Sequence, residues 1–229
     1  MHAKTDTTTV VPRRKPAAPW MAAWTGEQFL KTPLVLQPDR SGIAYLDELS
    51  VDRGRHGVLL HRGRGWAAPD RRGRALYGEV HFGRQRRAMA KLLCHVCGGT
   101  ADRSDVGVFW LLDNVPEKCP EGWPEEELTV HPPVCAPCAI RAIAECPELE
   151  EKGVTAVRVR DPQPYGYRGR LYTRDLTDPA PRIPILSKPA ENLSLDSPLL
   201  PWLLAAQFIM CLVDCTVVSL KEECAVAGR

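Results

Sequence analysis

Two Cys-x-x-Cys pairs are the residues of this chain best suited to chemistry. Cys94 and Cys97 form the first pair, Cys135 and Cys138 form the second, and 37 residues lie between the pairs. This spacing brings both sulfurs of a pair within reach of one ion, and two pairs supply the four thiolates of a tetrahedral zinc site. The sequence therefore predicts one structural Zn²⁺ held by these four side chains.

Other interpretations of the cysteines remain open. Cys119 lies between the pairs and Cys146 follows the second, so either could replace one of the four ligands. Neither has a second cysteine at metal-ligating spacing, which favours a plain thiol at both positions. The pairs could also be unrelated reduced thiols in a core, or the second pair could be redox-active.

The sequence around the pairs is typical of a treble-clef zinc unit. Gly98 and Gly99 follow the first pair and allow a tight turn around a metal. The second pair opens the helix-forming run AIRAIAEC, so its thiolates would lie at a helix N-terminus. Between the pairs, residues 106–112 are predicted as a strand and 128–130 as its short partner. Knuckle, hairpin and helix in this order resemble the treble-clef family.

Further elements predict an α+β protein. Residues 1–19 are Thr-rich and punctuated by proline, which indicates a disordered tail. Apolar runs at 34–36, 43–46 and 58–60, separated by turn residues, indicate a small antiparallel β-meander. The pattern GRQRRAMAKLL predicts an amphipathic helix over 83–93 that leads into the first cysteine pair.

These elements would form one Arg-rich zinc-binding domain over residues 20–177. Its first part, 20–29, has tryptophans four residues apart, which would share one face of a helix. Its last part contains the alternating run 154–160, which predicts a strand.

Two segments would follow this domain. Residues 178–198 are Pro-rich and are predicted as a linker. Residues 199–229 would pack back on the domain through a buried helix over 199–213 and a strand over 215–220. The apolar run is too short for a bilayer, which needs about 20 apolar residues, so no membrane partner is expected.

Composition limits the class of protein. The 229 residues have room for one domain of ordinary size or two small ones, and 44% hydrophobic content is that of a globular chain. Nine cysteines show no disulfide-like framework, and no cationic-then-apolar leader precedes them. These features predict a reducing cytoplasm, where Cys-x-x-Cys indicates metal or redox chemistry rather than disulfides.

Charge is unevenly distributed along the chain. The net charge is only +2, yet residues 53–91 contain 11 Lys and Arg against two acidic residues, and residues 117–152 contain nine Glu against three Lys and Arg. Such separation predicts one basic and one acidic surface for different partners.

The basic segment contains the candidate partner-binding or nucleic-acid-binding residues. A Gly/Arg loop over 61–77 interleaves cations with aromatic rings, as contacts to a nucleic-acid backbone and its bases require. The helix over 83–93 would carry a basic stripe opposite its apolar face. The same two sequence patterns are also typical of a solvent-exposed hairpin and of an ordinary amphipathic helix with a solvent-exposed cationic face. The candidates are Arg62, Arg64, Trp66, Arg71, Arg72, Arg84, Arg87 and Lys91.

No catalytic motif is recognisable in the sequence. Walker, dinucleotide-binding and nucleophile-elbow patterns are absent. Treble clefs include the HNH-like nucleases, but here Ala139 follows Cys138 and the predicted strand VFWLLD has no histidine. His131 lies outside that strand, next to Pro132. Four thiolates would also leave the metal no open position for water, so we expect a protein that is not an enzyme.

A longer stretch of the chain carries a further resemblance. The run HRGRGWAAPDRRGRALYGEVHFGRQRRAMAKLLCHVCGG, followed by PPVCAPCA, resembles Arg-rich, zinc-ligating accessory proteins of actinobacteria and their phages. Within that group it is similar to the recombination directionality factors of large serine integrases, over roughly residues 20–147. The resemblance implies a non-enzymatic protein that binds a serine integrase on DNA and switches recombination from integration to excision. A zinc-stabilised DNA-binding regulatory protein is the alternative.

Overall fold

The computed structural model describes residues 18–227, except 29, 31, 55, 114–118, 147, 148, 150 and 152, with side chains described as far as 223. The predicted tail at 1–19 therefore lies almost wholly outside the described residues. The described chain is mixed α+β, as predicted, and consists mostly of sheet with few helices. None of its helices combines the length and the apolar content needed to cross a membrane.

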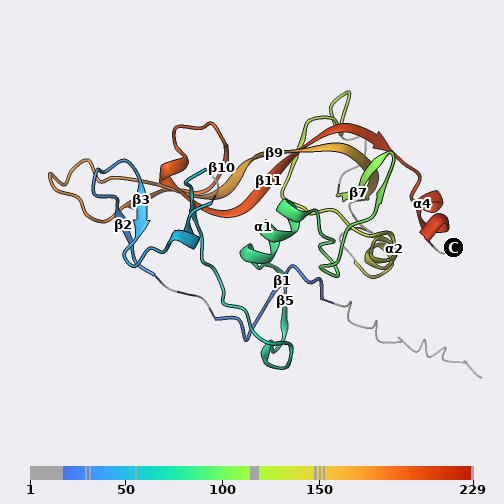
Figure 1. The fold of residues 1–229 in the computed structure, drawn as a ribbon, viewed down its shortest axis with the longest axis horizontal. Helices are drawn as coiled ribbons and strands as arrows, with labels where there is room; N and C mark the ends of the chain where they lie inside the picture. The colour runs from blue at the N-terminus through green and yellow to red at the C-terminus, as the bar shows by residue number, and fades with distance from the viewer. Residues whose placement is uncertain are drawn as a thin grey trace, which may run out of the picture.

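Two long antiparallel strands form the centre of the molecule. β9 (Thr155–Thr173) and β11 (Leu203–Val217) pair along nearly their whole length, and we call them the central ribbon (Figure 1). Shorter strands extend both edges of this ribbon into one seven-stranded sheet. Two strands pair with β9, namely β7 (Gly107–Leu112) and β10 (Ile185–Ser194), and the short β6 (Arg103–Ser104) pairs with β7. Two further strands, β4 (Leu59–Leu60) and β8 (Glu127–Thr129), pair with β11.

The C-terminal helix predicted over 199–213 is wrong, because most of this run is β11. Leu203 and Leu204 are both buried, yet they point into different core clusters on opposite faces of the sheet. A strand covered on both faces needs apolar residues at successive positions, so the alternation that marks a half-exposed strand is lost. A short 3-10 turn, η4 (Leu200–Trp202), precedes β11, and helix α4 (Leu220–Ala227) follows it in place of the predicted strand end.

The Pro-rich linker predicted over 178–198 is also wrong in its central part. β10 lies within this segment and pairs antiparallel with the end of β9, from Ile185 opposite Thr173 to Ser194 opposite Gly166. Register shifts on either side of Lys188 let a proline remain in the strand, because Pro189 lies at an irregularity where no regular ladder hydrogen bond is needed. The C-terminal segment therefore belongs to the main sheet.

The predicted meander is correct for two of its three strands. β2 (Leu34–Leu36) and β3 (Ile43–Tyr45) pair antiparallel. The third run contributes β4, which pairs in parallel with β11. Its Leu59 packs with Leu204 of β11 and with Ile43, so the meander is joined to the sheet through a shared core. A 3-10 turn, η1 (Ser50–Asp52), lies between β3 and β4.

A second small sheet extends from the body. β1 (Ala22–Trp24) pairs antiparallel with β5 (Ala75–Val80), and the 3-10 turn η2 (Pro69–Arg71) lies before β5. We call β1, η2 and β5 the arm, which runs from α1 away from the central ribbon (Figure 1). Trp20 and Trp24 therefore do not share a helix face, the arrangement that their spacing suggested. The backbone of Ala22–Trp24 pairs with β5 instead, and Gly26 donates to the carbonyl of Arg72 at 2.8 Å.

Helix α1 (Phe82–Lys91) confirms the helix predicted over 83–93 and packs across β11. It begins where His81 Nδ1 accepts from the amide of Arg84, and it ends at Leu92, whose φ of 50° is left-handed. The buried Gln85 side chain bonds both the amide and the carbonyl of Phe208 and also the carbonyl of Val130. A polar side chain thus satisfies backbone groups where β11 is irregular.

Candidate metal centre

The end of α1 leads directly into the first cysteine pair. After the left-handed Leu92, the amide of Cys94 donates to the carbonyl of Gly99 at 2.7 Å, and the amide of Gly98 donates to the carbonyl of Cys94 at 2.8 Å. Gly98 has a φ of 74°, a left-handed conformation that favours glycine. Residues 94–99 therefore close the tight turn predicted from the sequence, which we call the knuckle.

The second cysteine pair lies at the start of a helix, as predicted. Cys135 is the N-cap of α2 (Ala136–Glu145), and Pro137 occupies its first turn. The amides of Cys138 and Ala139 both donate to the carbonyl of Cys135 at 3.0 Å. The partial positive charge of a helix N-terminus favours thiolates at these positions.

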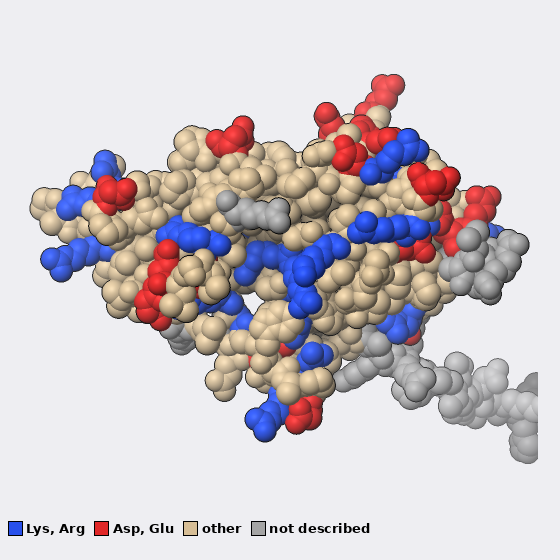
Figure 2. Space-filling model, viewed as in Figure 1, with Lys and Arg blue, Asp and Glu red and all other residues tan. Residues whose placement is uncertain are grey.

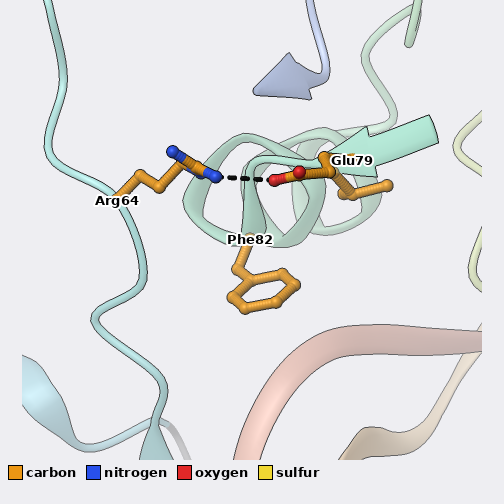
Figure 3. Close-up of a pocket in the computed structure, with 4 residues that line it drawn as sticks. Arg64, Glu79 and Phe82 are labelled. Carbon is orange, nitrogen blue, oxygen red and sulfur yellow. Dashed lines mark hydrogen bonds and ion pairs between the residues drawn. The ribbon is translucent and has the colours of Figure 1, made fainter. Parts of the chain in front are cut away.

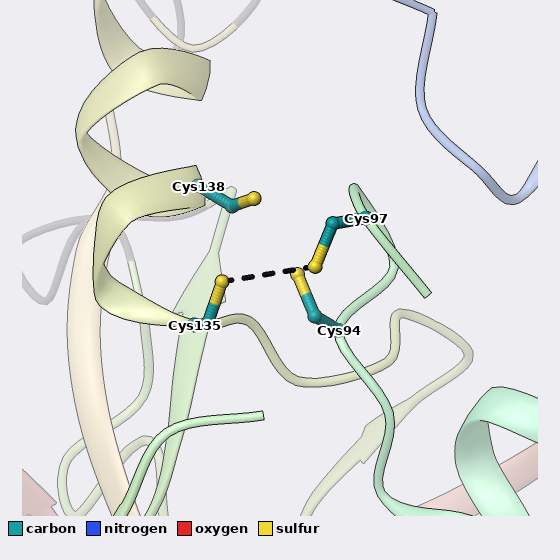
Figure 4. Close-up of side chains that lie close together, drawn as sticks. All are labelled: Cys94, Cys97, Cys135 and Cys138. Atoms are coloured by element: carbon teal, nitrogen blue, oxygen red, sulfur yellow. Dashed lines mark hydrogen bonds between the residues drawn. The ribbon is translucent and has the colours of Figure 1, made fainter. Parts of the chain in front are cut away.

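Figure 4 shows the four predicted ligand side chains converging from the knuckle and from α2. All four sulfurs lie within 4.8 Å of one another, and Cys97 Sγ is 3.9 Å from Cys135 Sγ. Ligands at about 2.3 Å from a tetrahedral zinc would be about 3.8 Å apart, whereas a disulfide requires about 2.05 Å. The cluster has the dimensions for one metal ion.

Cys119 and Cys146 do not join the cluster. Both are half-buried free thiols, and the group of possible metal ligands found in the described part of the chain contains only the four predicted cysteines.

The centre is buried on one side and open on the other. Cys94 and Cys138 are buried in a core cluster with Phe109 and Val134, whereas Cys97 is exposed. The same cluster includes residues of β7 and β9, so the knuckle and α2 together cover one end of the main sheet. A metal ion here would join two segments far apart in sequence on top of that core.

Cys94, Cys97 and Cys138 differ in their tendency to ionise. Burial raises the pKa of Cys94, and burial together with the neighbouring thiols raises the pKa of Cys138. Burial also disfavours ionisation of Cys97, but hydrogen bonds from the Gly99 amide and from the other thiols outweigh it and lower the pKa of Cys97. Without a cation the thiols compete for negative charge, and a bound divalent ion would stabilise all four as thiolates.

The hairpin between the cysteine pairs is formed by a different pair of strands than predicted. Both predicted strands exist, but β8 pairs with β11 through Thr129 opposite Met210, not with β7. β7 instead pairs with the short β6 and with β9. The amide of Val134 donates to the carbonyl of Phe109 at 2.9 Å, which ties the segment before α2 to β7.

Two arginines predicted as partner-binding residues have acidic partners within the chain. Arg62 bonds Asp52 and Asp47 at 2.6 and 2.8 Å, and this contact lowers the pKa of Asp52. Arg64 pairs with Glu79 at 2.6 Å (Figure 3). A small cavity of about 240 Å³ lies beside this pair and is also lined by Val80 and Phe82.

The predicted exposed stripe on α1 is wrong at Arg84. This side chain is fully buried and pairs with the equally buried Glu27 from the turn after β1. Its guanidinium also lies 5.0 Å from the centre of the Trp66 ring. Arg84 can be buried because Glu27, 57 positions earlier in the chain, neutralises its charge on the face of α1 that the sequence pattern assigns to solvent.

The remaining candidates are more accessible. Trp66 is 57% exposed, and Arg72 is half-buried and bonds the carbonyl of Ala67 at 3.3 Å. The other three candidates, which are all cations, are exposed. Figure 2 shows Lys and Arg side chains gathered across the middle of one face, over α1 and the central ribbon. The exposed cations among the candidates are Arg71, Arg87 and Lys91.

Sequence reasoning missed the residues that orient these arginines. Glu27, Asp52 and Gln85 are all buried polar residues, and no local pattern identifies their partners, which lie elsewhere in the sequence. Comparison of the chain with protein-family models, with curated proteins and with solved structures gave no match.

Proposed function

We propose that the four-cysteine centre holds one Zn²⁺ and that this ion is structural. Four soft sulfur ligands at tetrahedral spacing suit zinc. Cys94, Cys97, Cys135 and Cys138 would fill all four positions, which leaves no site on the metal for water or substrate. A treble-clef-like arrangement is supported by the chain order of knuckle, β6–β7 hairpin and α2, with one cysteine pair at each end.

We further propose that the protein is a non-enzymatic accessory protein that binds a serine integrase on DNA and switches recombination from integration to excision. The observation that carries a binding role is the exposed indole of Trp66, which packs against His81 at the start of α1, together with the exposed Arg71 in η2 of the arm. Tryptophan and arginine are the side chains that most often anchor protein interfaces. The choice of an integrase as partner is supported by the resemblance of residues 20–147.

A switch of this kind imposes a thermodynamic requirement. The protein must bind one arrangement of the integrase more tightly than the other, because a ligand with equal affinity for both shifts no equilibrium. A rigid, metal-supported surface suits this requirement, since its shape can match one arrangement and not the other.

A DNA-binding regulator is the second candidate, favoured by the exposed cations on two elements. Arg71 lies in the arm, and Arg87 and Lys91 lie on α1. Such cations can bind phosphates without a protein partner. Arg62, Arg64 and Arg84 contribute less to either role than the sequence suggests, because each has a carboxylate partner within the chain.

Gel-shift experiments with attachment-site DNA separate the two candidates. The accessory protein should change the mobility of DNA only when integrase is present, and it should increase the excision product in a recombination assay. A regulator should shift the DNA alone, and its affinity should fall steeply with salt concentration. A shift without integrase, together with no effect on recombination, would reject the accessory role.

A further inference from the structure

The two residues that precede the first strand of the arm are attached to the knuckle by their backbone. The amide of Trp20 donates to the carbonyl of Val96 at 2.8 Å, and the amide of Met21 donates to the carbonyl of His95 at 3.2 Å. Both acceptors lie between the ligands Cys94 and Cys97. Their carbonyls keep these directions only while the chain between the two cysteines keeps its turn.

A side-chain contact reinforces this attachment. The ring of Trp20 lies so close to Gly98 that a Cβ at this position would be 2.7 Å from it. The same ring contacts Trp66 edge-on, with ring centroids 6.4 Å apart. The knuckle is therefore connected through one indole to the exposed aromatic residue beside the arm.

Beyond the knuckle, β1 is held by α1 and by the residue that caps it. The amide of His81 donates to the carbonyl of Met21 at 2.9 Å, and Arg84 donates to the carbonyl of Ala22 at 2.8 Å. Glu27 accepts from the amide of Trp24 at 3.0 Å while it pairs with Arg84. An isolated two-stranded sheet is marginally stable in water, so the arm depends on these outside contacts.

The central ribbon does not share this dependence. Its core clusters contain residues such as Val157, Leu171 and Leu203 and include none of the four cysteines. The cysteine cluster covers only the end of the sheet near β7. Loss of the metal would therefore disturb the knuckle and the elements attached to it before the ribbon.

We propose that the metal centre is a conformational lock for the arm. With the metal bound, the knuckle holds Trp20 and the start of β1 in place, so that Arg71 in the arm and Trp66 beside it have a fixed position. Without the metal, the turn between Cys94 and Cys97 relaxes and the bonds from Trp20 and Met21 are lost. The arm, then held by α1 alone, becomes more mobile while the ribbon stays folded. The lock itself does not require the proposed function. Only one consequence rests on that function, namely that metal loss would weaken partner binding.

Hydrogen–deuterium exchange of the full-length protein tests the lock without any partner. Exchange is compared before and after zinc removal by a chelator, in peptides that cover the arm and in peptides that cover β9 and β11. Amides of β1 and β5 should exchange at least ~10-fold faster after zinc removal, because local opening controls exchange. Amides in the middle of β9 and β11 should change by less than about twofold.

A variant that keeps the metal tests the connecting residue. Trp20→Ala should retain one zinc per chain and still accelerate exchange in β1 and β5, because it removes the indole between Gly98 and Trp66. Trp202→Ala is the matched control, since Trp202 packs against the core at the other end of the ribbon. This control should leave exchange in the arm unchanged.

Three results would overturn the lock. The first is an arm whose exchange does not respond to zinc removal, and the second is a ribbon that opens together with the arm to the same extent. The third is a zinc-loaded Trp20→Ala protein with normal exchange in β1 and β5. Integrase binding is measured separately, so the lock can fail while the proposed function stands, and the lock can hold while integrase is not bound.

Discussion

Removal of the Glu27 carboxylate should destabilise the protein strongly. Neither Glu27 nor Arg84 is exposed. Arg84 also donates to the carbonyl of Ala22 at 2.8 Å, and Glu27 accepts from the amide of Trp24 at 3.0 Å. A Glu27→Ala protein would therefore contain a buried guanidinium without its counter-charge and a backbone amide without its acceptor.

The expected loss is about 3–5 kcal/mol of unfolding free energy, because an uncompensated charge remains in the interior. Domains of this size unfold with only about 5–15 kcal/mol, so the variant should be close to the limit of folding. The double variant Glu27→Leu with Arg84→Met removes both charges and should recover most of the loss. Glu79→Ala is the control, because it breaks the pair with Arg64 where the Glu79 side chain is 54% exposed, and it should cost at most about 1 kcal/mol.

Urea-induced unfolding followed by circular dichroism measures all four proteins. The free energies are compared at equal denaturant slopes, so that changes in the unfolded state are not mistaken for changes in stability. A Glu27→Ala cost no larger than that of Glu79→Ala would refute the burial of the pair. A double variant as unstable as the single one would show that shape, not charge, determines the loss.

Three further predictions concern the metal, the α1 anchor and pH. Elemental analysis of protein purified without chelator should find one zinc per chain, which Cys97→Ser should lose and Cys119→Ser should keep. Gln85→Met should lower the unfolding free energy by about 2 kcal/mol or more in urea titrations, because it leaves backbone groups of Phe208 and Val130 unsatisfied. Burial, Arg170 and Arg86 lower the pKa of His61 from 6.5 to about 4, so its contribution to stability is complete above about 6.5 and is lost as pH falls toward 4. His61→Gln should make the decline of stability over this range shallower, and an unchanged pH profile would contradict this role.

The metal ligands could be predicted because their signal is local. A Cys-x-x-Cys pair fixes two sulfurs by chain geometry alone, and the helix that begins at Cys135 is marked by its own composition. The helix α1 and the β2–β3 pair were likewise visible from short-range patterns. The hairpin partner of β7 was not, because β8 is taken up by β11, which lies about 80 positions further along the chain.

The errors at β10 and β11 have a common physical origin in pairing with distant strands. β11 lacks alternation because both of its faces are covered, so its sequence is as compatible with a buried helix as with a strand. β10 contains Pro189 and lies in a Pro-rich segment, which suggests a linker, yet its register shifts accommodate this proline. In both segments the tertiary environment, not the local pattern, determines the structure.

The local sequence also does not show where the positive charge of the basic segment, residues 53–91, lies on the surface. Of its described cations, Arg53, Arg62, Arg64 and Arg84 pair with acids at Glu48, Asp52, Glu79 and Glu27, and Arg86 donates to the carbonyl of Ala206. The local excess of positive charge therefore does not lie on one continuous surface. Among the described residues of this segment, the exposed cations lie in the arm and on the outer face of α1, at Arg71, Arg74, Arg87 and Lys91. A partner that recognises the charge of this segment must contact these two elements, whose relative position is set by the direct contacts of β1 with α1 and by the knuckle that adjoins both.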